Sequence, residues 1–211
     1  MNVEINYNKV LRKKTLFYEV FFVDEKFNIS DLKKHLTNSE YLYTLDLLKT
    51  KDLKEKLIIS EISSKKKIIL VSIEKNIKHF EAENLGAKFY SFLKSIKINN
   101  FIINTDYMPY KLKNFVGHFL HGLKLKSYIF DKYKTKKNKK KINFFIVSKN
   151  IPSKMDRIKF NSIEEGTFYT RDLVSEPGNV LHPDEYAKRI NSLKKLGLKI
   201  NIYDEKKLKK L

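Results

Sequence analysis

Histidines and one acidic turn are the residues whose types and spacing could bind a metal ion. His118 and His121 lie three residues apart, which places both imidazoles on one face of a helix. Zinc takes three or four protein ligands, and the neighbouring sequence supplies no further donor. We therefore interpret the two residues as helix-surface histidines. His35, His79 and His182 are isolated in the sequence, and we expect each to be structural or exposed.

Acid–base and phosphate-binding patterns are equally weak. Glu164 and Glu165 are adjacent on a predicted helix, so their carboxylates should diverge instead of sharing a proton. The tripeptide Asn104-Thr105-Asp106 follows a predicted strand, and we interpret it as a strand-end turn and not as a metal site. The six glycines are scattered, which excludes a glycine-rich phosphate loop. We assign no catalytic, cofactor-binding or metal-binding residue.

The chain carries a large positive charge. Its 44 Lys and Arg residues against 24 acidic residues give a net charge of +20. The densest basic run is 132–141, with seven lysines in ten residues. Nucleic-acid sites favour the bidentate guanidinium, whereas only four residues here are arginine. We interpret the charge as compositional bias and the run as a solvated loop, with nucleic-acid binding as the alternative.

Composition also indicates the cellular compartment of the protein and how large a hydrophobic core it can build. The absence of cysteine removes disulfides and thiolate chemistry, and the N-terminal residues lack the apolar stretch of a signal peptide. With 42% apolar residues in 211, the chain can build one complete domain and part of another. We expect a cytoplasmic globular protein with no membrane-spanning segment.

The elements that must position these residues follow an α/β pattern. Short apolar runs, typical of strands covered on both faces of a mostly parallel sheet, alternate with amphipathic stretches. The predicted strands are 16–23, 68–73, 101–103 and 142–147. Between them, two apolar stripes recur at helical spacing, and we assign their aromatic residues to the core. The stripes are Leu85, Phe89, Phe92, Leu93 and Ile96, and Leu112, Phe115, Val116, Phe119, Leu120 and Leu123.

A second unit is predicted after the polar segment 148–157. A helix should cover 159–175 and stop at Pro177 and Gly178. Pro183 should begin another helix that ends near Gly197. The segment 198–203 alternates like a strand, and Asp204 can cap a last helix.

Two segments carry a family resemblance. The first, 121–137, contains a glycine-bearing helix followed by a Tyr-x-Phe-Asp-x-Tyr-Lys pattern. The second, 166–188, contains Arg-Asp-Leu-Val, then a turn with Pro and Asn, then a Pro that opens a helix. In order and spacing these segments resemble leucyl aminopeptidases of the M17 peptidase family. The matching residues are Gly122, Tyr128, Phe130, Asp131, Tyr133, Lys134, Arg171, Asp172, Leu173, Val174, Pro177, Asn179 and Pro183; Ser175 and His182 stand where the family often has Asn and Thr.

The resemblance implies a fold, a domain division and an activity for the parent family. It implies a macro-domain-like α/β domain over 1–150, a linker helix and turn over 151–182, and the truncated start of a catalytic domain over 183–211. Members are cytosolic homohexamers that remove N-terminal amino acids from peptides. Two divalent metals, manganese or zinc, activate a bridging water and polarise the peptide carbonyl.

The family's metal-binding motifs do not occur in this sequence. They are a Gly-Lys-Gly…Phe-Asp-x-Gly-Gly segment and an Asn-Thr-Asp-Ala-Glu-Gly-Arg segment; Asn104-Thr105-Asp106 reproduces only three letters of the latter. We therefore expect the N-terminal, non-catalytic portion of a leucyl aminopeptidase-like protein, without cofactor and inactive alone. The alternatives are a lysine-rich nucleic-acid-binding module and an assembly module that associates with a separate catalytic chain.

Overall fold

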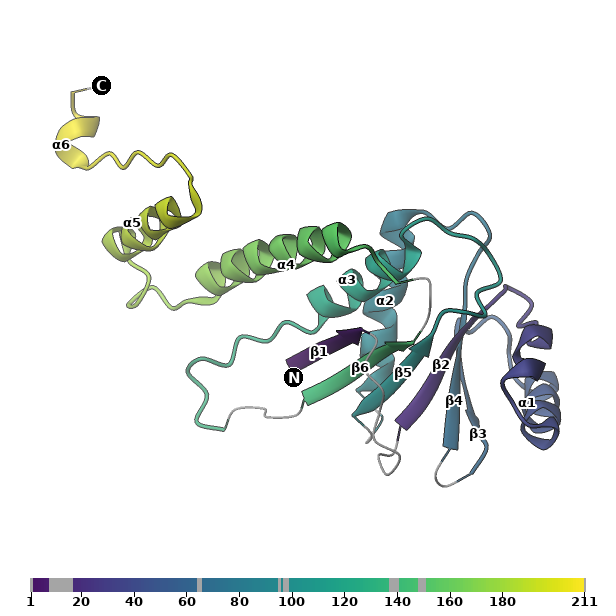
Figure 1. Cartoon of the computed structure of the whole chain (residues 1–211). Helices are drawn as coiled ribbons and strands as arrows, with labels where there is room; N and C mark the ends of the chain where they lie inside the picture. The colour runs from purple at the N-terminus through teal and green to yellow at the C-terminus, as the bar shows by residue number, and fades with distance from the viewer. Residues whose placement is uncertain are drawn as a thin grey trace. The chain divides into compact units, whose positions relative to one another are not determined.

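A mostly parallel sheet organises the first part of the chain. The computed structural model describes residues 2–7, 17–63, 66–94, 96, 99–136, 141–147 and 151–210. Within these ranges six strands form one sheet, in which only β3 runs antiparallel to its neighbour (Figure 1). Their order across the sheet is β1 (Asn2–Tyr7), β6 (Lys141–Val147), β5 (Asn100–Asn104), β2 (Phe17–Val23), β4 (Lys66–Ser72) and β3 (Leu57–Glu61).

Helices cover both faces of this sheet. The helices α2 and α3 pack against each other on one face, and α1 covers the β2–β4–β3 half of the other face (Figure 1). The chain then continues through α4, α5 and α6. The helical bounds are η1 (Ser30–Lys34), α1 (Asn38–Thr50), α2 (His79–Leu93), α3 (Phe115–Lys126), α4 (Lys154–Ser175), α5 (Pro183–Ser192), η2 (Leu193–Leu196) and α6 (Glu205–Leu208), where η denotes a 3₁₀-helix.

The chain divides into two compact units. Unit 1 is Met1–Glu164 and unit 2 is Glu165–Leu211, so the helix α4 contributes its first half to unit 1 and its second half to unit 2. The mixed α/β class with a mostly parallel sheet is confirmed. The predicted domain bounds at residues 150 and 182 stay a prediction.

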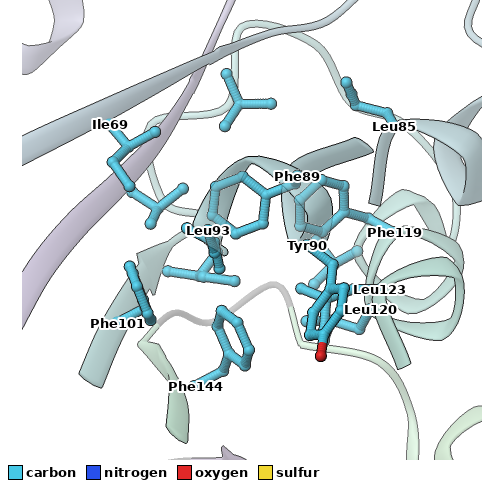
Figure 2. Close-up of a cluster of buried hydrophobic side chains, with 14 of the residues drawn as sticks. Ile69, Leu85, Phe89, Tyr90, Leu93, Phe101, Phe119, Leu120, Leu123 and Phe144 are labelled. Atoms are coloured by element: carbon cyan, nitrogen blue, oxygen red, sulfur yellow. The ribbon is translucent and has the colours of Figure 1, made fainter. Parts of the chain in front are cut away.

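Two apolar clusters form the core of unit 1, one on each face of the sheet. The larger cluster joins the sheet to α2 and α3, and Figure 2 shows Phe89 of α2 between Phe119 of α3 and Phe144 of β6, with its ring tilted against both. The smaller cluster joins the sheet to α1 and η1 through Phe21 and Leu70. Since β2 and β4 supply side chains to both clusters, the prediction of strands buried on both faces is confirmed for these two.

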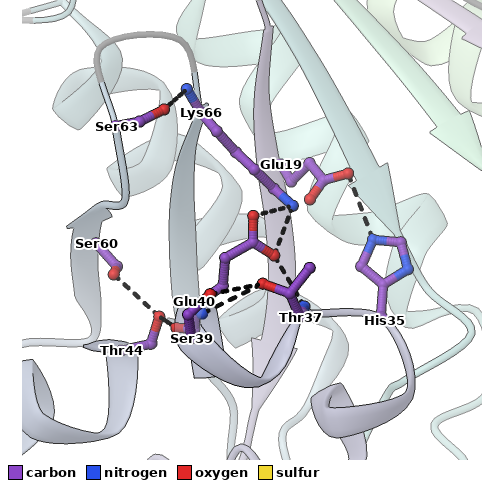
Figure 3. Close-up of polar contacts among 9 residues, drawn as sticks. All are labelled: Glu19, His35, Thr37, Ser39, Glu40, Thr44, Ser60, Ser63 and Lys66. Atoms are coloured by element: carbon purple, nitrogen blue, oxygen red, sulfur yellow. Dashed lines mark hydrogen bonds and ion pairs between the residues drawn. The ribbon is translucent and has the colours of Figure 1, made fainter. Parts of the chain in front are cut away.

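Side-chain hydrogen bonds fix the start of α1 against the sheet. Thr37 and Glu40 form a reciprocal capping box, which satisfies backbone N–H groups at the helix start. Lys66 of β4 forms an ion pair with Glu40 at 2.9 Å (Figure 3). Deeper in the interface, the hydroxyl groups of Thr44 and Ser60 lie 3.1 Å apart. These contacts tie α1 to β3 and β4.

The four predicted strands are confirmed as β2, β4, β5 and β6. The two apolar stripes lie on α2 and α3 except for Ile96, which follows α2, and Leu112, which precedes α3. Residue 16, the first of the predicted strand 16–23, lies outside the described residues, as do 148–150 of the predicted polar exit segment. The elements β1, β3, η1 and α1 were not predicted. The helix α4 begins at Lys154, five residues earlier than predicted, because the Ser153 hydroxyl accepts a hydrogen bond from the Asp156 N–H and caps the helix.

In unit 2 the helix starting at Pro183 and the cap at Asp204 are confirmed, since the Asp204 carboxylate accepts the Lys207 N–H at 2.9 Å. Gly197 follows the turn η2 with φ of 85°, a conformation that glycine adopts without strain. The prediction of a strand at 198–203 is wrong, because these residues have no regular structure and no strand pairs with them in the described part of the chain.

Candidate functional site

The first half of α4 packs against α3 through an aromatic ring. Phe160 lies against the rings of His118 and His121, with ring centroids 4.9 and 5.0 Å away. Gly117 makes room for it, since a Cβ atom at that position would lie 2.6 Å from the Phe160 ring. The junction between α3 and α4 is therefore built around one phenyl ring.

A buried hydrogen bond between a histidine and a glutamate lies beside this ring. His121 Nδ1 is 2.9 Å from Glu164 Oε1, and the two side chains are only 6% and 8% exposed. The prediction that His121 is a helix-surface histidine is therefore wrong: α4 covers it and supplies its carboxylate. Glu164 is buried while Glu165 is exposed, so these carboxylates diverge as expected. No sequence pattern indicated the pair, whose members are 43 residues apart.

The other histidines also have defined surroundings in unit 1. His118 Nδ1 lies 2.7 Å from Glu83 Oε1 on α2, and the His79 ring stacks on the His118 ring at 4.1 Å. His35 lies 3.4 Å from Glu19, with its ring against Phe21. None of these contacts between described residues brings a third ligand to the His118 and His121 pair.

The described residues do not fit a two-metal centre. Across these ranges no group of three or more His, Cys, Asp or Glu side chains could hold a metal ion. At Asn104-Thr105-Asp106, Asn104 ends β5, and its side-chain oxygen accepts the Asp106 N–H at 3.0 Å. This is the predicted strand-end turn.

In unit 2 an arginine ties two helices together. Arg189 of α5 donates to Glu176 at 2.9 Å and to Glu185 at 3.0 Å, and the Glu176 side chain is 1% exposed. Hydrogen bonds to Glu176 and Glu185 raise the pKa of Arg189, and the bond from Arg189 lowers the pKa of Glu185. The Tyr169 hydroxyl donates to the Arg189 carbonyl. This network was not predicted, although the i, i+4 spacing of Glu185 and Arg189 was a signal for it.

The same unit contains the whole of the second family segment, 166–188. Leu173 is buried, and the turn after α4 is closed by the N–H groups of Val180 and Leu181, which both donate to the Pro177 carbonyl. His182 is the N-cap residue of α5, but its side chain makes no capping hydrogen bond. The segment therefore forms the end of α4, a turn and the start of α5, and the Arg189 network holds the two helices together.

Unit 2 also exposes much apolar surface. Val174 is 82% exposed and Leu196 is 76% exposed. Further exposed apolar side chains of unit 2 are Tyr186, Leu198, Ile202, Tyr203 and Leu208.

Two further predictions from the sequence concern the lysine run and membrane-spanning helices. The lysine run 132–141 is exposed over 132–136, while 137–140, four of its ten residues, lie outside the described part, so nucleic-acid binding stays a prediction. No helix within the described ranges has the length and apolar character needed to cross a membrane.

Comparisons with known proteins connect the chain to aminopeptidases. No protein-family model matches it. A probable cytosol aminopeptidase of Sulfurihydrogenibium sp. is 34% identical over 127 residues, which are 56% of this chain and 25% of that protein. A probable cytosol aminopeptidase of Bradyrhizobium sp. is 38% identical over 95 residues, 43% of this chain and 19% of that protein. The chain thus spans about a fifth to a quarter of the length of these relatives.

Solved structures show the same fold. A mutant of tomato leucine aminopeptidase matches 99% of this chain and 46% of its own with a TM-score of 0.67 at 16% identity. The bottromycin maturation enzyme BotP in complex with Mn matches 92% of this chain and 39% of its own with a TM-score of 0.63 at 13% identity. The α/β architecture of this chain is therefore that of the N-terminal part of such proteins.

Proposed function

We propose that this chain is the non-catalytic N-terminal portion of a leucyl aminopeptidase-like protein. The premise is that it is a relative of the M17 cytosol aminopeptidases and matches their N-terminal domain. The observation that carries the proposal is the 34% identity over 127 residues, which make up only a quarter of the relative. The shared fold supports it.

The metal-binding side chains available in the chain support the assignment of a non-catalytic role. In the family, two divalent metals supply the hydrolytic chemistry, and a solved structure of BotP is in complex with Mn. The described residues bring no three metal-binding side chains together, and the sequence lacks both metal-binding motifs of the family. These residues do not fit a manganese or zinc pair, so we derive no catalytic step from this chain.

The role we propose for unit 2 is attachment to the catalytic portion of an aminopeptidase, in the same polypeptide or in a separate chain. Its exposed apolar side chains, including Leu196 and Leu198, would be covered by that portion. By analogy with the family, the complete assembly would be a cytoplasmic homohexamer that acts on peptides.

Replacing the matching segment of a relative tests the family role. The Sulfurihydrogenibium protein is first assayed on leucine p-nitroanilide with added manganese, and its matching segment is then exchanged for that of this chain. We expect the chimera to keep manganese-dependent turnover, because the two segments should build the same domain. A chimera that folds but has lost turnover contradicts the proposal.

The isolated 211-residue chain tests the non-catalytic assignment separately. We expect no hydrolysis of leucine p-nitroanilide above the manganese blank, because the described residues and the sequence motifs supply no metal-ligand set. Turnover that a chelator abolishes would show that the chain builds a metal centre of its own and would refute this assignment.

A further inference from the structure

A cleft of about 650 Å³ opens in unit 1, where the edge strand β1 meets α3 and the first half of α4. Its volume lies in the range of small-molecule sites, about 300–1,000 Å³. One part of the wall is apolar, formed by Val3, Ile5, Leu120, Ile158 and Phe160. Ile158 is 52% exposed, so a ligand in the cleft would cover it.

The polar part of the cleft has more positive than negative charge available. Arg157, Lys124 and Lys154 line it. The acidic groups are already engaged: Glu164 pairs with His121 and lies 3.8 Å from Lys124, and Glu4 pairs with Lys141. Lys124 therefore already has a carboxylate partner, whereas no ion pair between described residues involves Arg157 or Lys154, so a ligand that enters the cleft meets the charge of these two cations.

Arg157 makes a cation–π contact in the cleft. Its guanidinium lies 4.7 Å from the centre of the Tyr7 ring, and within the described residues no acidic side chain forms an ion pair with it. A guanidinium that contacts an aromatic face keeps its planar fork of N–H donors, which suits bidentate binding of a carboxylate or phosphate.

Tyr7 adds a neutral polar group to the same wall. Burial raises the pKa of Tyr7 to about 12, against an opposing effect of Arg157 and with a smaller contribution from Glu164 in the same direction as burial. At neutral pH the phenol is therefore protonated and does not cancel the charge of Arg157.

We propose that this cleft binds a small molecule that has a carboxylate or phosphate head group on an apolar body. The head group would bind Arg157, with Lys124 and Lys154 contributing charge, and the body would lie against Leu120 and Phe160. The binding is non-covalent, and it is independent of the aminopeptidase role proposed above.

Titration of the ¹⁵N-labelled chain, followed by amide NMR, tests the proposal with three probes. They are 4-phenylbutyrate, phenyl phosphate and the neutral 4-phenylbutyramide. We expect saturable shifts at residues 117–124 and 154–161 with at least one anion, and binding of the amide about tenfold weaker, because it lacks the charge-assisted bonds. The tighter anion identifies the head group. No saturable shift with either anion, or an amide that binds equally, overturns the proposal.

Variants locate the binding group. Arg157→Gln should weaken anion binding by about tenfold, and Arg157→Lys should recover part of the loss because charge is kept without the planar fork. Lys159→Gln, on the same helix but outside the cleft, should bind like the parent. If Arg157→Gln does not fold, Lys124→Gln should still lower the affinity. A folded Arg157→Gln protein with parental affinity contradicts the site.

Discussion

At two positions the helices α2 and α3 leave no room for a side chain. A Cβ atom at Gly86 would lie 1.9 Å from the Phe119 carbonyl oxygen, and one at Gly122 would lie 1.9 Å from the Glu83 carbonyl oxygen. Both obstacles are backbone atoms, which cannot rotate away. The close packing of α2 against α3 therefore explains why a glycine stands at position 122, in the first family segment.

Alanine substitutions test this contact. Gly86→Ala and Gly122→Ala should each destabilise the chain by at least the usual cost of overpacking, about 1–3 kcal/mol. Gly166→Ala is the matched control, since no atom of the described residues lies within 4 Å of its Cβ position in α4 and alanine favours a helix interior by about 1 kcal/mol. Urea unfolding followed by circular dichroism gives the three values. Equal effects at Gly122 and Gly166 would contradict the close approach.

The buried hydrogen bond between His121 and Glu164 gives a second prediction. Glu164→Leu should cost about 1–3 kcal/mol because it leaves a buried imidazole N–H without its hydrogen-bond acceptor. His121→Leu/Glu164→Leu should recover much of this loss, since neither polar group is then left alone. Glu205→Gln, which breaks an exposed pair with Lys209, should cost less than about 1 kcal/mol in the same urea unfolding measurement. A double variant no more stable than Glu164→Leu would show that the pair is not coupled.

A hydrogen bond between two loops gives a pH prediction. The Tyr110 hydroxyl donates to Glu25 at 2.7 Å, and this bond is the main reason why the pKa of Tyr110 is raised from 10.0 to about 12. The same bond lowers the pKa of Glu25. A raised tyrosine pKa means that the stabilisation is complete below pH 10 and is lost as the pH rises through about 12. The lowered Glu25 pKa adds a stabilisation that is lost as the pH falls below its ordinary value.

Glu25→Gln removes the charged acceptor, so the pKa of Tyr110 should fall toward 10.0, its ordinary value. Tyrosine Cζ chemical shifts, followed by ¹³C NMR between about pH 8 and pH 13, measure this directly. The Tyr7 signal is the internal control, because its pKa is raised by burial and should not respond to Glu25. An unchanged Tyr110 titration would mean that the bond does not form in solution.

Among the elements, those inside the sheet were predictable and those at its edges were not. The strands β2 and β4 are apolar on both faces and stand out in the sequence. The edge strand β1 alternates polar and apolar residues but is only six residues long and has no continuous apolar run, and β3 is short and follows a lysine-rich stretch. The helix α1 was missed because its exposed face also has apolar residues, Leu42 and Tyr43, which obscures the helical period.

The α3–α4 junction was beyond sequence reasoning for a different reason. The spacing of His118 and His121 correctly placed them on one helix. Their burial depends on Phe160 and Glu164 of α4, a helix that is separated from α3 in the sequence by β6 and its flanking loops. Patterns along the chain report which residues share a face, whereas the element that covers that face is fixed by tertiary packing.

The segment 198–203 shows the same limit and gives a prediction at this scale. Its alternating pattern is that of a strand, yet its backbone lies between the Gly197 turn and the Asp204 cap without pairing in the described part of the chain. We expect its amides to exchange with deuterium in seconds, while those of 142–146 in β6 are strongly protected. Mass spectrometry measures both. Protection of 198–203 equal to that of α5 would mean that a strand partner is present.

For the molecule as a whole, charge is the main constraint. A net charge of +20 on 211 residues destabilises the compact state by self-repulsion, and salt screens this repulsion because the Debye length falls from about 10 Å at 0.1 M to 3 Å at 1 M. We therefore expect Tm to rise by a few degrees between about 50 mM and 500 mM NaCl, measured by differential scanning calorimetry.

Surface ion pairs would give the opposite response, since salt weakens attraction as well as repulsion. The double variant Lys134→Glu/Lys136→Glu distinguishes the screening of repulsion from the screening of ion pairs. Both lysines are exposed, and each substitution lowers the net charge by two. This variant should be more stable than the parent at low salt and should gain less from added NaCl. A parent Tm that falls with salt would show that the exposed pairs, such as Lys56 with Glu74, outweigh the surplus of lysines.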